Sequence, residues 1–157
     1  MTESSAPKKQ FAIQKLYLKD TSFESPDSPH SFSYTRWEPK IDLNLTNTHT
    51  HVDGDIYEAV LCVTATIKLE DKTAFLIEVH FAGLFGISGF DEAEKKYLLG
   101  SQCMTVLFPY AREVISDMTI RGGFPPLILS PVNFDGLYQQ HLEKQQENEV
   151  DSEEVAH

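Results

Sequence analysis

The chain has 157 residues, and its 13 lysines and arginines against 24 acidic residues give a net charge of −11. This length predicts a single domain. The negative field repels phosphate backbones and so argues against nucleic acid as a partner. No apolar run approaches the roughly 18–20 residues that a membrane-spanning helix needs, and residues 1–10 lack the apolar segment of a signal peptide. With two cysteines and no disulfide framework, we expect a cytoplasmic protein without direct membrane insertion.

The two ends of the chain differ in composition from its middle. Residues 1–10 are short, polar and contain a proline, and residues 146–157 are dominated by acidic side chains. Such segments carry too little apolar area to offset the entropy of ordering them. The composition therefore predicts a disordered N-terminus (1–10), one folded domain (11–145) and a disordered acidic tail (146–157).

Alternating side chains in the first half of the chain predict strands. Residues 11–19 form a probable strand, the Pro/Ser/Asp-rich residues 25–29 a loop, residues 41–46 a half-buried strand, and residues 53–55 a turn. The clearest signal is the run of apolar residues at every odd position from Tyr57 to Leu69, which resumes from Phe75 to Phe81 after a polar turn at residues 70–73. A period of two over this length excludes a helix and predicts an antiparallel hairpin.

Beyond the glycine-rich residues 83–89 the apolar period becomes helical. A short helix is predicted over residues 91–99, and a longer one over about 107–118, with Pro109 in its first turn and Gly122 and Gly123 at its end. A last helix is expected to start at Asn133 as its N-cap. Strands first and helices last indicate an α+β fold, an antiparallel sheet of about four strands with helices packed on one face.

No arrangement of residues in the sequence indicates catalysis. His49 and His51 are a conceivable metal pair, but no third ligand has a convincing spacing, and a solvated polar loop is the favoured interpretation. His80 is placed on the polar side of its strand. Cys103 precedes the long helix without an identifiable general base, so a buried hydrophobic role is favoured over a nucleophilic one. We therefore expect no enzyme activity, no metal and no cofactor.

Aromatic residues are abundant on elements that should meet. Each can belong to the core or to an apolar groove that accepts side chains of another polypeptide. The nominated groove residues are Trp37, Phe75, Phe85, Phe108, Phe124 and Phe134. The apolar face formed by Ile77, Val79 and Phe81 exceeds what one sheet-and-helix layer needs, which predicts that these three lie in an oligomer interface.

Several motifs together resemble the SecB family of bacterial protein-export chaperones over about residues 11–138. The longest are Ile13-Gln14-Lys15-Leu16-Tyr17-Leu18-Lys19-Asp20, Thr73-Ala74-Phe75-Leu76-Ile77-Glu78-Val79, Leu107-Phe108-Pro109-Tyr110-Ala111-Arg112-Glu113 and Pro131-Val132-Asn133-Phe134-Asp135. The chain departs from the family where Cys103-Met104-Thr105 stands in place of the usual Cys-Pro-Asn.

The resemblance implies an ATP-independent holdase that keeps secretory precursors unfolded and delivers them to the motor ATPase SecA. It also implies a homotetramer, a dimer of dimers, that binds unfolded precursors in a hydrophobic groove and carries no cofactor. Matched residue by residue, the SecA-binding surface would include Asp20, Glu24, Leu76 and Glu78. Two other classes stay open: a hotdog-type thioesterase, which would need a catalytic group at a helix N-terminus, and a structural oligomer without a client.

Overall fold

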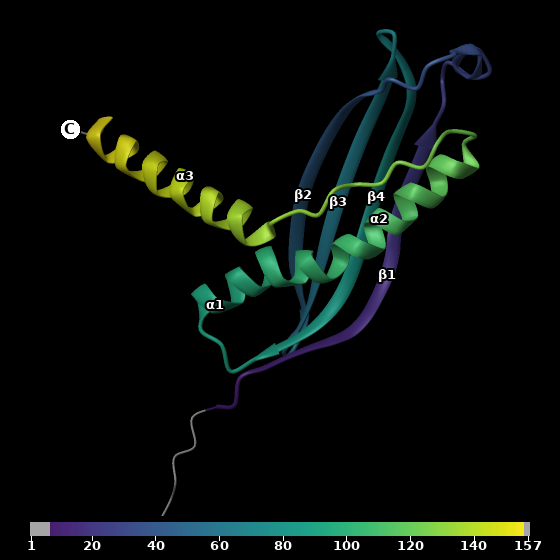
Figure 1. The fold of residues 1–157 in the computed structure, drawn as a ribbon. Coiled ribbons are helices and arrows are strands. Elements are labelled where there is room, and N and C mark those ends of the chain that lie inside the picture. The colour runs from purple at the N-terminus through teal and green to yellow at the C-terminus, as the bar shows by residue number, and fades with distance from the viewer. Residues whose placement is uncertain (1–6, 156–157) are drawn as a thin grey trace, which may run out of the picture.

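A computed structural model describes residues 7–155 and has the predicted α+β architecture (Figure 1). The strands are β1 (Gln10–Glu24), β2 (Lys40–Asp53), β3 (Ile56–Leu69) and β4 (Lys72–Ser88). The helices are the 3-10 turn η1 (His30–Ser33), α1 (Glu92–Tyr97), the π-helical turn η2 (Leu98–Gln102), α2 (Cys103–Arg121) and α3 (Phe134–Val155). The four strands form one antiparallel sheet in the order β1-β4-β3-β2.

Two tight turns form the hairpins of the sheet, and one long connection places β1 at its edge. Between β3 and β4, Glu70 and Asp71 both have positive φ (49° and 65°), as a two-residue hairpin turn with the right twist requires. Gly54, at φ 53°, serves the β2–β3 turn. The connection from β1 to β2, residues 25–39, runs from one edge of the sheet to the other, because β1 pairs with β4 and not with β2.

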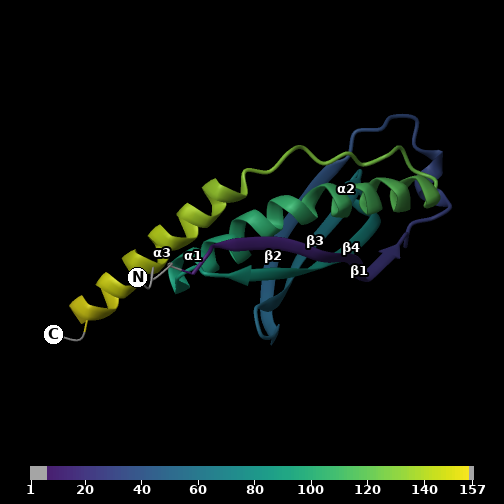
Figure 2. The same ribbon diagram turned by 90° about the horizontal axis from the view of Figure 1, so that it is seen from below.

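The alternation in β3 and β4 divides the sheet into two faces. The buried face carries the odd-numbered apolar residues of both strands: Leu61, Val63, Ala65, Ile67, Phe75, Ile77, Val79, Phe81, Phe85 and Ile87. Helix α2 packs on this face across β4 and β3 (Figure 2). We call the face covered by α2 the helix face, and the opposite face of the sheet the open face.

Helix α2 begins earlier than the sequence predicts. The chain stays helical from Glu92 through Arg121, and Pro109 lies inside α2, not in its first turn. A proline inside a helix removes one backbone hydrogen bond and costs about 3 kcal/mol. The buried stripe that starts at Cys103 and Met104 and continues to Ile115 offsets that cost, because each large side chain buried there contributes roughly 1.5–3 kcal/mol.

Two strands and the last helix are also longer than predicted. Strand β2 continues through His49 and His51, which are not in a loop, and β4 continues to Ser88. Helix α3 runs to Val155 and so contains most of the predicted disordered tail. Its sequence there is rich in Glu and Gln and free of Gly and Pro, which favours a helix. Of the predicted disordered N-terminus, residues 7–9 have no regular secondary structure and Gln10 begins β1, and residues 1–6 and 156–157 lie outside the described residues.

Helix α3 is fixed at its start and extends away from the sheet (Figures 1 and 2). The Asn133 side chain accepts a hydrogen bond from the Gly136 N–H at 3.0 Å, which confirms the predicted N-cap. The Asp135 carboxylate accepts hydrogen bonds from Tyr97, at 2.8 Å, and Ser101. Among the described residues, no helix is long and apolar enough to cross a membrane.

Candidate functional site

Five aromatic rings meet at one end of the helix face. Phe75 of β4 is at the centre, with ring centroids 5.6 Å from Phe23 and 4.8 Å from Phe124, and Phe124 lies 5.2 Å from Phe32 and 6.1 Å from Trp37. These distances are in the range of favourable aromatic pairs. We call these five residues the aromatic cluster. It joins β1, the 25–39 connection, β4 and the segment that follows α2.

Exposure separates the members of the aromatic cluster. Phe75 is fully buried and Phe124 is 6% exposed, whereas Phe32 is 51% and Trp37 is 40% exposed. The rings of Phe32 and Trp37 are thus exposed to solvent and pack against the buried Phe124 ring. Ile41 and Leu43, which follow Trp37 in the chain, are also exposed and share the helix face, because they pair with Ile67 and Ala65. Phe23 and Phe32 were not predicted from the sequence, although Phe32 is in the same connection as Trp37.

A glycine allows the end of α2 to approach this cluster closely. A Cβ atom at Gly122 would lie 2.3 Å from the Phe23 ring, far inside van der Waals contact. The Ser116 hydroxyl donates to the Leu127 carbonyl at 2.9 Å and so ties the 122–133 segment to α2. Phe124 lies in the chain between Gly122 and Leu127, so the packing of Gly122 and the hydrogen bond to Leu127 together fix its position.

The other nominated groove residues lie elsewhere and belong to the core. Phe85 stacks on Phe11 with centroids 5.6 Å apart, and Phe108 meets Phe134 edge-to-face at 5.6 Å. All three nominated rings are buried. Of the six residues proposed for a groove, the structure brings Trp37, Phe75 and Phe124 together, and only Trp37 is exposed.

The predicted oligomer-interface residues are buried within a single chain. Ile77, Val79 and Phe81 are on the helix face, at 2%, 0% and 8% exposure, and they pack in the core beneath α2. The structure therefore places these three residues in the core of one chain and not on its surface. The apolar surplus that suggested an interface is taken up by α2 and the 122–133 segment.

The predicted docking residues gather on the open face. Strand register places Glu24 opposite Leu76, Ser22 opposite Glu78 and Asp20 opposite His80. Asp20, Glu24, Leu76 and Glu78 are all exposed. We call these four residues the acidic patch. It combines three carboxylates with one apolar side chain on two paired strands.

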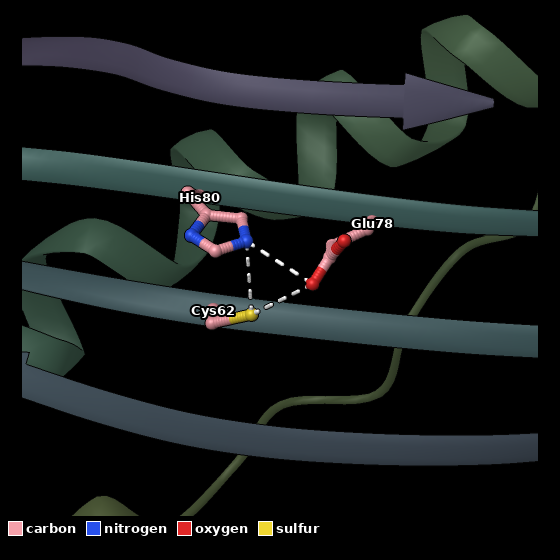
Figure 3. A group of neighbouring side chains, drawn as sticks. All are labelled: Cys62, Glu78 and His80. Atoms are coloured by element: carbon pink, nitrogen blue, oxygen red, sulfur yellow. Dashed lines mark hydrogen bonds and ion pairs between the residues drawn. The ribbon is translucent and has the colours of Figure 1, made fainter.

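A second group on the open face, which includes Glu78 of the acidic patch, was not predicted from the sequence. Cys62 of β3 and His80 of β4 are directly paired, and Glu78 is two residues from His80 on the same face (Figure 3). The Cys62 sulfur lies 3.4 Å from His80 Nε2 and 3.7 Å from Glu78 Oε1, and the last two atoms are 3.1 Å apart. Only the hairpin register brings residue 62 to residues 78 and 80.

The two cysteines are in different surroundings. Burial raises the pKa of Cys103 to about 12, so this thiol stays protonated and the predicted role of a buried hydrophobic residue is confirmed. Burial also raises the pKa of Cys62; the Thr46 hydroxyl opposes that rise, and the Glu78 carboxylate adds to it.

A separate polar contact joins β1 and β3 on the open face. The Lys19 ammonium lies 2.6 Å from the Glu58 carboxylate, which also accepts a hydrogen bond from the Tyr17 hydroxyl. Partial burial, reinforced by this hydrogen bond, raises the pKa of Tyr17 to about 12. The Lys19 hydrogen bond lowers the pKa of Glu58. These groups satisfy one another and fix the edge strand β1.

Comparisons with known proteins agree with the fold. The family model for SecB, preprotein translocase subunit SecB, matches residues 4–145. The protein-export protein SecB of Methylococcus capsulatus is 52% identical over 145 residues, covering 92% of this chain and 93% of that one. The SecB protein of Nitrosococcus oceani is 48% identical over 157 residues, covering 99% and 94%.

A solved structure shows the same fold at lower identity. The SecB-like chaperone of Mycobacterium tuberculosis, in complex with an antitoxin peptide, aligns with a TM-score of 0.66 at 22% identity, covering 78% of this chain and 90% of that one. Taken with the family model and the relatives, this likeness leads to one conclusion: the chain belongs to the SecB family.

Proposed function

We propose that this chain is an ATP-independent holdase of the cytoplasm, which binds unfolded secretory precursors and delivers them to SecA. The observation that carries the proposal is the aromatic cluster, where exposed Phe32 and Trp37 lie on buried Phe124 in a member of an export-chaperone family. The protein acts by binding alone, as a non-enzymatic chaperone without a cofactor.

The chemistry of the aromatic cluster suits an unfolded client. Apolar burial is non-directional and contributes about 25 cal/mol per Å², so an extended segment with aromatic or aliphatic side chains gains affinity without a fixed sequence. A folded protein keeps such side chains in its own core and offers less apolar surface for binding. The aromatic cluster therefore selects for the unfolded state, as delivery to a translocation motor requires.

The first test is a refolding assay without ATP. A slow-folding precursor should remain unfolded when the tetramer is present in at least equimolar amount, because bound segments are withheld from folding. The double variant Phe32→Ala, Trp37→Ala removes most of the exposed aromatic area and should weaken client binding by about tenfold or more, or roughly 1.4 kcal/mol.

Tyr110→Ala is a matched control for this assay, since Tyr110 is similarly exposed but stacks on Phe81 outside the aromatic cluster. Refolding of the precursor, followed by its fluorescence, should proceed further with the double variant than with Tyr110→Ala. Equal arrest by the wild type and the double variant would contradict the role given to the cluster, and no arrest by the wild type would contradict the holdase function.

We further propose that the acidic patch docks SecA. Glu24 is directly opposite Leu76, Glu78 is two residues along the same strand, and Asp20 lies further along β1. Leu76 is 37% exposed, so the patch offers both charge and an apolar contact. The chain's net charge of −11 favours a basic partner surface. The patch and the aromatic cluster are on opposite faces of the sheet, which allows client and motor to bind together.

We also propose a homotetramer, a dimer of dimers. Strand β1 is an edge strand with free backbone groups and two exposed apolar residues, Ile13 and Leu18. Such an edge favours pairing with another copy. Light scattering should give four times the chain mass of 17.8 kDa. A stable monomer at micromolar concentration would contradict this assembly.

A further inference from the structure

The Cys62, Glu78 and His80 side chains have the composition of a metal site. Thiolate, imidazole and carboxylate are the three groups that bind Zn²⁺ in proteins. They are on neighbouring inner strands of the sheet, β3 and β4, whose pairing is regular at these positions. Ligands on a paired sheet are held more rigidly than ligands on loops. The three groups are thus pre-positioned by the backbone.

Their separations match those of a tetrahedral ion. Zinc bond lengths of about 2.3 Å to sulfur and about 2.0–2.2 Å to nitrogen and oxygen imply ligand pairs about 3.6 Å apart for S–N and S–O and about 3.4 Å for N–O. The observed distances are 3.4 Å, 3.7 Å and 3.1 Å. All three agree within about 0.3 Å, so a metal fits with very little side-chain movement.

The surroundings permit entry and support one ligand. Glu78 is exposed, and Cys62 and His80 are half-buried, so one side of the triad is open to solvent. Thr46 of β2 is the strand partner of Cys62 and lies on the same face of the sheet. Groups that contact a ligand from outside the metal shell typically change metal affinity by 10–100-fold.

We propose that Cys62, Glu78 and His80 bind a divalent transition-metal ion, with Zn²⁺ the preferred one, on the open face of the sheet. The protein supplies three ligands, and the fourth position faces solvent, where water completes the tetrahedron. The imidazole binds through Nε2, the atom nearest both other ligands. Binding displaces the thiol proton to solvent and changes no oxidation state.

Cobalt is a direct probe of this site. The full-length chain, freed of metal with a chelator and kept reduced, is titrated with Co²⁺ and followed by absorption spectroscopy. We expect one Co²⁺ per chain, with a thiolate-to-cobalt charge-transfer band and the intense visible bands of a tetrahedral site. Zn²⁺ should displace the cobalt and remove both signals, because it binds nitrogen and sulfur sites more tightly than Co²⁺.

Variants identify the ligands. Cys62→Ser should abolish the charge-transfer band and lower metal affinity by more than about tenfold, and His80→Gln should lower the affinity comparably. Cys103→Ala and His51→Gln are matched controls that should bind Co²⁺ as the wild type does, because Cys103 is buried in α2 and His51 contacts Gly54. Circular dichroism checks that each variant is folded.

Two results would overturn the metal site: wild-type protein without a thiolate band, or a Cys62→Ser variant with the same band and affinity. The titration contains no partner protein, so its outcome is independent of the proposed SecA docking, which shares Glu78.

Discussion

Ile77→Asp is expected to unfold the chain, and not merely to dissociate an assembly. Ile77 is 2% exposed and is flanked by Phe23 on β1 and Ala65 on β3. Losing the buried aliphatic side chain costs about 2–5 kcal/mol. Burying an unpaired carboxylate adds several kcal/mol more. The sum is comparable with the 5–15 kcal/mol that stabilises a typical domain.

Leu76→Asp is the matched control, because it introduces the same charge one residue away on the open face. Leu76 is partly exposed, so its replacement should change the free energy of unfolding by less than about 1 kcal/mol. Urea denaturation followed by circular dichroism measures both variants, and light scattering gives their mass. If Ile77→Asp unfolds as cooperatively as the wild type and only its mass decreases, residue 77 is at an interface after all.

Charge reversal in the acidic patch is expected to have the largest effect on partner binding. Glu78→Lys replaces an attraction for a basic surface with a repulsion and leaves the aromatic cluster on the other face unchanged. We expect SecA affinity to fall by about tenfold or more, which is at least about 1.4 kcal/mol. Exposed charges are screened beyond about 8–10 Å near physiological salt, so wild-type association should also slow as salt increases.

Calorimetric titration of SecA into three proteins tests this docking site. Asp20→Ala should weaken binding less than Glu78→Lys, since it removes a charge without reversing one. Glu147→Lys is the matched control, because it makes the same charge change at an exposed site on α3, far from the patch in sequence. Unchanged SecA affinity in both patch variants would leave these acids as solubilising groups only. Client capture in the refolding assay should be normal in all three.

Local patterns predicted the sheet because period two needs no tertiary information. The alternation from Tyr57 to Phe81 defined a hairpin and assigned Leu76 and Glu78 to one face and Phe75 and Ile77 to the other, as the structure has them. The same pattern could not say which face α2 covers. It therefore could not show that Ile77 belongs to the core of one chain.

Helix limits were harder to predict because their signals compete. Pro109 is typical of a first helical turn, yet the buried stripe beginning at Cys103 continues the helix through it. In the C-terminal tail, acidic composition predicts disorder while the absence of Gly and Pro favours a helix, and α3 extends to Val155. Amino-acid composition alone does not show which of these opposing tendencies decides where a helix begins or ends.

The sequence by itself determined the α+β class, the hairpin and the motifs of the SecB family, because each depends on residues close together in the chain. Only the tertiary structure decided which residues meet across long separations. It joined Phe32 and Trp37 to Phe124, buried Phe85, Phe108 and Phe134, and brought Cys62 to Glu78 and His80. These contacts depend on strand register and on the path of the 25–39 and 122–133 segments, and neither leaves a periodic signal in the sequence.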